Sequence, residues 1–425
     1  MTATIRDQRA FLSTPYFLAS LIFAFAIHAG EQKITATDGS SLDQFGYSVA
    51  ISGDTIVVGA LLDTVNGNFE QGSAYVFAKS GGAWTERAKL SARDGAARDE
   101  FGYGVAISGD TIAIGSRKND VGTNEDQGFV SIFERAGDAW TETEKLTAND
   151  GAAGDLFGHS VAMYGDTVVA GAPQVDVGPY ASYGAAYVFV RAGNGWTQQA
   201  ILKATDGFTS DSFGLTVAID AETVVVGASR HDVGGNVNQG AAYVFVRQGN
   251  HWIQQAQLTA NDGVSYDELG RSVAISGDTI LIGSLAGIGA NAYQGAAYVF
   301  VREGSVWTQQ AKLIAPDGAD NDRFGFAVAL ANDTAVIGSF GDDIGPNANQ
   351  GSVYVFERQQ GAWTKRSKLT TSDGSTFDDL GYSVGISGDT IVAGASGDDE
   401  AANLDQGSAY LFPAHPNGRR RAVRR

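Results

Sequence analysis

The feature that most constrains this chain is a phrase that recurs seven times along it. The stretch FGYSVAISGDTIVVGA at residues 45–60 returns as FGYGVAISGDTIAIGS at 101–116 and as FGHSVAMYGDTVVAGA at 157–172. The copies follow one another at 56, 56, 56, 56, 55 and 56 residues, starting at Phe45, Phe101, Phe157, Phe213, Leu269, Phe324 and Leu380. Every tryptophan keeps nearly the same step, at Trp84, Trp140, Trp196, Trp252, Trp307 and Trp363. A period near 50 residues indicates a repeat architecture.

One unit divides into four short strands. Residues 48–52 (SVAIS) and 55–60 (TIVVGA) predict two strands joined by a Gly-Asp turn, because glycine accepts a positive φ there. The continuous apolar run of the second strand predicts burial on both of its faces. Residues 73–78 predict a third strand, and 84–90 predict a fourth strand with one wet face. Buried inner strands with an amphipathic outer strand are typical of one blade of a β-propeller.

The two ends of the repeat predict a ring that closes on itself. The last unit stops after its third strand, at 408–412, and has no tryptophan strand. Residues 31–39 (EQKITATDG) precede the first unit and match TEKLTANDG at 143–151. We therefore expect the N-terminal strand to complete the last blade, which hides the edges that an open sheet would expose. The predicted fold is all-β, a seven-bladed β-propeller with four antiparallel strands per blade, over residues 30–412.

The recurring phrase, with a Gly-Ala-Pro triplet at 171–173 in the third unit, resembles the FG-GAP repeat. The resemblance covers residues 31–412, and it implies the seven-bladed propeller of integrin α-subunits and of many bacterial exported proteins. Integrin-type repeats place Ca²⁺ in a long Asp-rich loop between the first two strands. Here those loops are short turns, such as the one at 52–54, which supply too few oxygens for that cage. The calcium role of the family is therefore not carried over by motif.

Composition narrows the choice of partner. There is no cysteine, which removes disulfides and thiolate chemistry. The net charge is −19, and five of the 29 basic side chains lie in the last seven residues, so the rest of the chain carries 24 basic against 48 acidic side chains. Such a body repels phosphate backbones, so we exclude nucleic acid as a partner. We expect a monomer.

Both ends of the chain differ from the repeat. Residues 1–29 contain Arg6 and Arg9, then an uncharged apolar stretch and small residues, which predicts a secretory signal peptide. An uncleaved hydrophobic segment is the alternative, and it would be the only contact with a membrane. Either interpretation predicts a secreted, cell-surface or periplasmic protein. Residues 413–425 predict a basic C-terminal tail.

The links between units and the loops between second and third strands share one face of the predicted disc, and both are acidic. Each link holds two aspartates, as in ATDGSSLDQFG. Turn formation explains them structurally, and a ring of Ca²⁺ sites is the alternative. The loops 341–351 and 397–407 add candidate calcium ligands at Asp342, Asp343, Asn347, Asp398, Asp399 and Asp405. For these loops we favour the simpler interpretation of a solvated polar segment.

The position directly after each FG pair differs between units and starts the innermost strand near the axis. The seven residues there are Tyr47, Tyr103, His159, Leu215, Arg271, Phe326 and Tyr382. The polar and aromatic members are candidate ligand-binding residues at an axial mouth: Tyr47, Tyr103, His159, Arg271 and Tyr382. Packing that merely fills the channel is the alternative. Tyr180 and Tyr183, which replace the usual Asn and Gln in the third unit, are further candidates.

The sequence supports a binding module better than an enzyme. It contains no HExxH or GxSxG motif and no phosphate-binding loop. We predict an exported, non-catalytic binding or adhesion module that recognises a protein or glycan partner through the acidic loop face, with Ca²⁺ as a candidate cofactor. One alternative is a propeller hydrolase or lyase at the axial mouth, around His159 and Arg271. A structural cell-surface scaffold is the other alternative.

Overall fold

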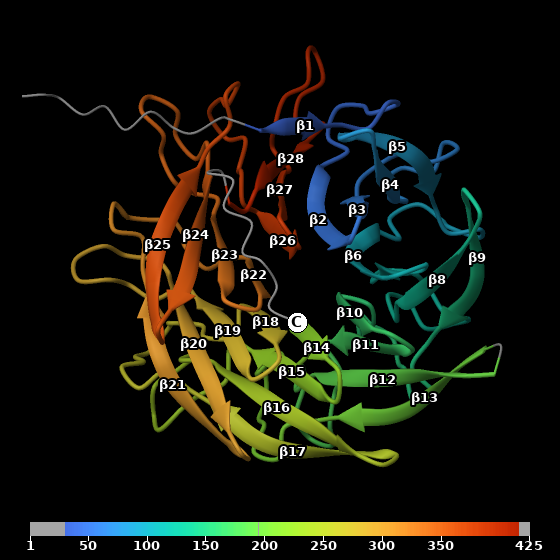
Figure 1. The fold of residues 1–425 in the computed structure, drawn as a ribbon. Coiled ribbons are helices and arrows are strands. Elements are labelled where there is room, and N and C mark those ends of the chain that lie inside the picture. Colours follow the sequence, from blue (N-terminus) through green and yellow to red (C-terminus); the bar gives the residue numbers. More distant parts are fainter. Residues whose placement is uncertain (1–29, 194, 416–425) are drawn as a thin grey trace, which may run out of the picture.

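Seven four-stranded antiparallel sheets stand around one central axis and form a closed ring (Figure 1). The computed structural model describes residues 30–193 and 195–415. All regular secondary-structure elements within these residues are β-strands, so the all-β, seven-bladed prediction is confirmed. None of these residues forms a helix that could cross a membrane.

The strands keep nearly the same bounds in every blade. Blades 1 to 3 consist of β2 (Phe45–Ser52), β3 (Thr55–Ala60), β4 (Ser73–Ser80) and β5 (Ala83–Leu90); β6 (Phe101–Ser108), β7 (Thr111–Ser116), β8 (Phe129–Ala136) and β9 (Ala139–Leu146); and β10 (Ser160–Tyr164), β11 (Thr167–Ala172), β12 (Ala185–Ala192) and β13 (Gly195–Leu202). Blades 4 to 6 consist of β14 (Thr216–Asp220), β15 (Thr223–Ala228), β16 (Ala241–Gln248) and β17 (His251–Leu258); β18 (Ser272–Ser276), β19 (Thr279–Ser284), β20 (Ala296–Glu303) and β21 (Val306–Leu313); and β22 (Val328–Ala331), β23 (Thr334–Ser339), β24 (Ser352–Gln359) and β25 (Ala362–Leu369). Blade 7 consists of β26 (Ser383–Ser387), β27 (Thr390–Ala395), β28 (Ser408–Pro413) and β1 (Gln32–Ile34).

The N-terminal strand closes the ring, as the sequence predicts. β1 pairs antiparallel with β28 and places Ile34 opposite Ala409. At the inner edge, the Ser383 hydroxyl of blade 7 donates to the Gly46 carbonyl of blade 1 at 2.7 Å. The same contact joins other neighbours, as between blades 1 and 2. The junction of the last and first blades is therefore built like the others, and β28 is not left as an unpaired edge.

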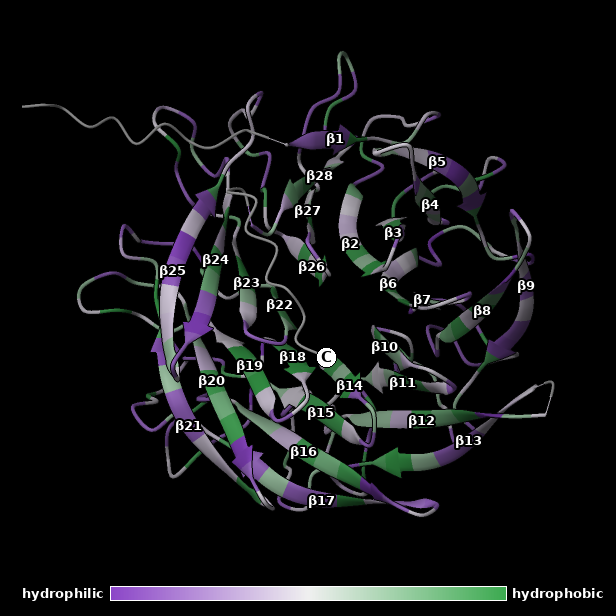
Figure 2. Ribbon diagram, in the orientation of Figure 1, coloured by the Kyte–Doolittle hydropathy of each residue, from purple (hydrophilic) through white to green (hydrophobic). Residues whose placement is uncertain are grey.

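The blades pack on one another through their buried inner strands. All six residues of β3 are buried, and the same is true of β11 and β15. Phe45 of the first FG pair is fully buried and meets the rings of Tyr75 and Phe77 edge-on, with centroids 5.5 and 5.9 Å apart. Figure 2 shows the contrast with outer strands such as β25, which carry much of the hydrophilic colour. This burial of apolar area is the main favourable term in folding.

Two glycines of each unit set the distance between neighbouring blades. Gly46 has a φ of 94°, in the left-handed region where other side chains are strained. A Cβ at Gly59 would lie 2.1 Å from the carbonyl oxygen of Gly102 in the next blade. The recurring FG and GA pairs are thus requirements of blade-to-blade packing. Their repetition carries no information about a ligand.

The outer strand contains a bulge that the sequence analysis did not predict. In β5, Trp84 is buried while Arg87 and Lys89 are exposed, as the alternating pattern predicts. The pairing of β5 with β4 skips Arg87, however, and the five other blades with a tryptophan strand shift in the same place. A bulge of this kind bends the strand and increases its twist.

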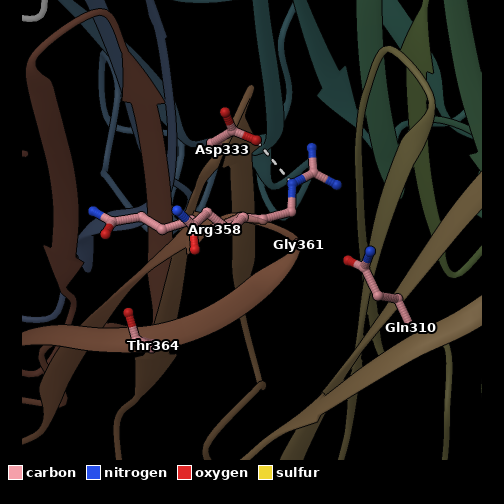
Figure 3. A pocket seen from close by; sticks show the side chains of 7 residues that line it. Gln310, Asp333, Arg358, Gly361 and Thr364 are labelled. Atoms are coloured by element: carbon pink, nitrogen blue, oxygen red, sulfur yellow. Dashed lines mark hydrogen bonds and ion pairs between the residues drawn. The ribbon is translucent and has the colours of Figure 1, made fainter.

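The two faces of the disc are built differently. The turn face carries the short hairpin turns of each blade, and the loop face carries the strand 2–3 loops and the interblade links. On the turn face one contact recurs in six blades, a Lys or Arg over the tryptophan ring, as with Arg302 and Trp307 at 5.1 Å. A hollow of about 720 Å³ on that face is lined by another of these arginines, Arg358, paired with Asp333 at 2.8 Å (Figure 3). The hollow therefore contains a repeated structural pair.

Candidate functional site

Repeated aspartates hold the links of the loop face together. In the first link Asp43 is buried, and its Oδ2 accepts the N–H of Ser40 at 2.6 Å. The same bond is made by Asp99, Asp155, Asp211, Asp267, Asp322 and Asp378. Burial raises the pKa of Asp43 to about 6, because a buried carboxylate is poorly solvated. The second aspartate of every link thus closes a turn, which agrees with the structural interpretation of these residues.

The first aspartate of a link meets a lysine and a tyrosine of the neighbouring strands. In blade 6, Lys368 pairs with Asp317 at 2.8 Å and with Asp342 at 2.7 Å. The hydroxyl of Tyr354 donates to the same two carboxylates at 3.0 and 3.2 Å. Blades 1 and 7 contain the same group, built from Asp38, Asp63, Lys89 and Tyr75 and from Asp373, Asp398, Lys33 and Tyr410. Asp342 and Asp398, two of the predicted calcium ligands, are therefore buried and paired with ammonium groups.

The other predicted calcium ligands bond within their own loops or to the adjoining link. Asp343 and Asp399 each accept a backbone N–H from six residues later, at 2.8 and 2.9 Å, which for Asp399 belongs to Asp405. The Asn347 amide donates to the Gly374 carbonyl at 2.9 Å. Within residues 30–193 and 195–415 there is no group of three or more His, Asp or Glu side chains that could hold a metal. Calcium binding stays a prediction.

The candidate tyrosines and histidine at the axis meet in one ring. Tyr47 lies between Tyr382 and Tyr103, with ring centroids 5.0 and 5.1 Å away. Tyr103 in turn lies 4.7 Å from the ring of His159. All four side chains are half-buried. The structure thus brings together, from four different blades, residues that are 56 or more positions apart in the chain.

Arg271 and Phe326 continue this ring. The Arg271 guanidinium lies 4.2 Å from the centroid of Phe326, and Phe326 lies 5.0 Å from Tyr382. Phe340, which directly follows β23, supports this side, because its ring centroid lies 4.5 and 5.3 Å from those of Phe326 and Tyr382. We call the seven positions after the FG pairs, from Tyr47 to Tyr382, the axial mouth.

His159 is a neutral hydrogen-bonding member of the axial mouth. Its Nδ1 lies 3.2 Å from the Leu215 carbonyl, which can only accept, so Nδ1 carries the proton and Nε2 accepts from the Tyr103 hydroxyl at 3.2 Å. Burial, with the guanidinium groups of Arg117 and Arg271, lowers the pKa of His159 to about 3. Both ring nitrogens are therefore engaged at neutral pH. The hydrolase or lyase alternative stays a hypothesis.

Tyr180 and Tyr183 take the places of an asparagine and a glutamine that bond to each other in the six other blades. Tyr183 is buried, and its hydroxyl donates to the Ala204 carbonyl. Tyr180 is half-buried and lies against Phe208, with centroids 4.9 Å apart. Of these two candidates, Tyr180 with Phe208 is the one that presents aromatic surface.

Sequence reasoning missed a set of exposed apolar side chains on the loop face. Among the described residues, nine of the fourteen exposed large hydrophobic side chains lie in strand 2–3 loops or in links beyond the Asp-Gly turn: Leu42, Phe69, Phe208, Val237, Val264, Tyr266, Tyr293, Phe377 and Leu404. We call this set the apolar rim. It includes residues at six of the seven blade junctions, and Gly154 and Glu125 take the corresponding positions between blades 2 and 3. A position-by-position comparison of the seven loops would have revealed it.

Backbone bonds between neighbouring blades fix the apolar rim in place. The N–H of Leu42 donates to the carbonyl of Leu404, and that of Tyr266 to Val237, both at 2.8 Å. Leu42 and Tyr266 have φ values of 71° and 69°, a conformation that costs a non-glycine residue about 1–2 kcal/mol. The loop tips are therefore held in a defined geometry by their neighbours.

A seven-bladed frame of recurring units with variable loops defines the class of the molecule, a repeat propeller. The chain belongs to the FG-GAP repeat family, whose model matches it at residues 29–77, 84–133, 140–189, 196–245, 252–300, 307–356 and 363–412. It is also similar to integrin alpha-2 of Mus musculus, with 31% identity over 153 residues. That match covers 33% of this chain and 12% of the length of the relative.

Proposed function

We propose that the protein is a non-catalytic binding module that recognises a protein partner through its loop face. The apolar rim is the observation that carries this proposal. Exposed apolar side chains that gather on one face of a soluble protein mark interaction sites. Aromatic residues are enriched in the cores of such interfaces. The axial mouth adds further aromatic residues at the centre of the ring.

The family supports this proposal, because the FG-GAP resemblance implies a binding or adhesion role. A glycan partner is the alternative, and the aromatic pair of Tyr180 and Phe208 is where we would expect a sugar ring to stack. Export and calcium assistance belong to the proposal as predictions. The segment on which export depends, residues 1–29, lies outside the described residues, as does most of the predicted tail, 416–425.

A capture experiment with matched variants tests the proposal. The loop-face variant carries Leu42→Ser, Tyr266→Ser and Phe377→Ser, which removes exposed apolar area at three junctions. The control carries Tyr164→Ser and Val306→Ser, which are also exposed apolar residues but lie off the loop face. We expect a protein that crosslinks to the wild type and to the control but not to the loop-face variant. Equal capture by all three proteins would contradict the proposal.

A further inference from the structure

We infer that the axial mouth takes a carboxylate, supplied by an aspartate or glutamate side chain of the protein partner and bound beside Arg271. The inference rests on the proposed function, because docking on the apolar rim would carry the partner's side chain to the axis. It specifies the chemistry of the partner at one position.

The aromatic faces of the mouth are not free to receive a cation. An aromatic ring attracts a cation to its face. The Arg117 guanidinium already lies 3.7 Å from the centroid of Tyr103, and Arg271 lies 4.2 Å from that of Phe326. The protein's own arginines therefore occupy these two faces. The Tyr103 hydroxyl already donates to His159, so what the mouth offers to a partner is guanidinium N–H groups, which are donors.

The two arginines differ in whether a carboxylate neutralises them. Arg117 pairs with Glu100 at 2.6 Å, and Lys118 reaches the same carboxylate at 2.5 Å. Arg271 forms no ion pair with any described residue, although the half-buried Glu268 lies three positions before it. A half-buried guanidinium without a counter-ion is a strong donor for a carboxylate, since its planar fork matches both oxygens.

The other carboxylate close to the mouth belongs to a separate group. Asp379 lies beside Arg323, Asp378 and Asp405, and its pKa is raised to about 7 by burial and by the neighbouring aspartates, against the effect of Arg323. Burial raises the pKa of Tyr382, and the charge of Arg271 opposes part of that rise. Arg271 and Tyr382 both lie against the ring of Phe326, at 4.2 and 5.0 Å from its centroid.

The ligand comes from a partner because the protein repels free anions. With a net charge of −19, the long-range field of the chain opposes the approach of an isolated anion. A carboxylate attached to a protein surface is brought in by the contacts of the apolar rim, and the local field of Arg271 then selects it. A neutral glutamine in the same position gains none of that selection.

A peptide pair tests this directly on the full-length chain. The probes are dansyl-Leu-Glu-Leu-amide and dansyl-Leu-Gln-Leu-amide, which differ only in the side-chain carboxylate, with binding followed by fluorescence anisotropy. We expect the glutamate peptide to bind the wild type about tenfold or more tightly than the glutamine peptide, as for a hydrogen-bonded charge pair. Arg271→Met should make the two peptides equal. Arg98→Met, the same change at an exposed arginine of the loop face, should keep the difference.

Four results would overturn the inference. Equal binding of the two peptides by the wild type, or a preference that survives Arg271→Met, would remove the carboxylate from the mouth. If a thermal melt shows that Arg271→Met is unfolded, the salt dependence of glutamate-peptide binding to the wild type replaces that variant. The affinity of a charge pair must fall between about 0.05 and 0.5 M salt, so an unchanged affinity would overturn the inference. If free glucuronate binds as tightly as the glutamate peptide, the ligand of the mouth is an acidic sugar and not a protein side chain.

The outcome is separable from that of the proposed function. The loop-face variant changes the apolar rim and leaves the mouth intact, whereas Arg271→Met changes the mouth alone. A partner that needs the rim but shows no preference for glutamate would contradict this inference and support the binding module. A glutamate preference together with equal capture by the wild type, the loop-face variant and the control would support this inference and contradict the proposed capture through the rim.

Discussion

The turn face and the loop face of this propeller are made from the same seven units, yet they differ in how strictly those units repeat. On the turn face a basic side chain lies over the tryptophan in six blades, at distances from 4.9 to 5.8 Å. On the loop face the backbone bonds repeat, but the exposed side chains change from blade to blade. Uniform positions follow from packing, and varied exposed positions are where recognition can differ between partners.

The acidic residues of the loop face show both kinds of position. Blades 1, 6 and 7 have a second aspartate over the lysine, whereas blade 5 has Ala286 in that place and blade 3 has Val175. In the three complete blades a serine on the third strand, such as Ser352, donates to that aspartate. In blades 3 and 5 an alanine stands there. The aspartate and the serine are thus present or absent together in these blades, because a buried carboxylate needs hydrogen-bond donors.

The largest expected effect separates a structural phenylalanine from a rim phenylalanine. Phe324 is fully buried against Tyr354 and Phe356, and Phe377 is 59% exposed. Phe324→Ala should lower the free energy of unfolding by about 3–5 kcal/mol, because it leaves a cavity. Phe377→Ala should change it by less than about 0.5 kcal/mol. Urea unfolding measures both, and equal losses would mean that the rim contributes to the fold.

The next effect compares two lysines of the loop face. Lys368→Met leaves the buried Asp342 without its cation and should cost about 3 kcal/mol. Lys312→Met is the control, because Lys312 pairs with one aspartate, Asp262, which is about half exposed. This variant should lower the free energy of unfolding by less than about 1 kcal/mol. Denaturant unfolding of the two variants gives the difference. If Lys312→Met proves as harmful as Lys368→Met, the second aspartate is not what makes the pair important.

The raised pKa of Asp378, the second aspartate of its link, predicts a loss of stability as the pH rises. Burial, with the charge of Asp398, raises the pKa of Asp378 to about 7, above its unfolded value near 3.8. The folded state therefore holds this proton more tightly, and the stabilisation present below pH 3.8 is lost between about pH 4 and 7. We expect the melting temperature to fall by about 2–4 °C between pH 5 and 7.5. Asp378→Asn should reduce that fall.

A turn-face aspartate provides the control for the pH experiment. Asp138 is exposed and lies in a hairpin turn, so Asp138→Asn should leave the pH dependence of the melting temperature as in the wild type. A fall that is the same in all three proteins would show that the link aspartates do not cause it.

The smallest expected effect concerns calcium. A metal that binds the folded state raises the melting temperature by mass action. Because Asp342 and Asp398 are already paired with lysines, we expect calcium assistance to be weak, so that millimolar Ca²⁺ raises the melting temperature by about 1 °C relative to EDTA. A larger, EDTA-reversible rise would instead assign Ca²⁺ to the loop face and place the predicted ligands in a metal site.

Much of the fold follows from the sequence because the same packing residues recur in all seven units. Phe45 and Gly59 recur at a fixed step since each blade must meet the next in the same way, and β1 is recognisable as the missing strand. The bulge at Arg87 carries no residue signature, because any side chain can occupy it. Its presence therefore had to come from the register of the strands.

The candidate site was only partly predictable. The position after each FG pair identified the mouth, because its residues break the symmetry of the repeat. The pairing of Lys368 with Asp342 depends on a strand and a loop that meet only in three dimensions, so a loop rich in oxygens was interpreted as a candidate calcium site. The apolar rim was missed because single residues such as Leu42 and Tyr266 form a set only when the ring brings their loops together.

The pairing of β1 with β28 has a consequence for how the protein is made. Ile34 can reach its partner Ala409 only after the residues up to β28 have been synthesised, so blade 7 is completed after the six other blades can form. A chain that stops before Ser408 keeps both an unpaired N-terminal strand and an open sheet edge, which are sites for aggregation and proteolysis. Ring closure thus depends on two strands from opposite ends of the propeller, and a molecule that lacks either one keeps an exposed edge.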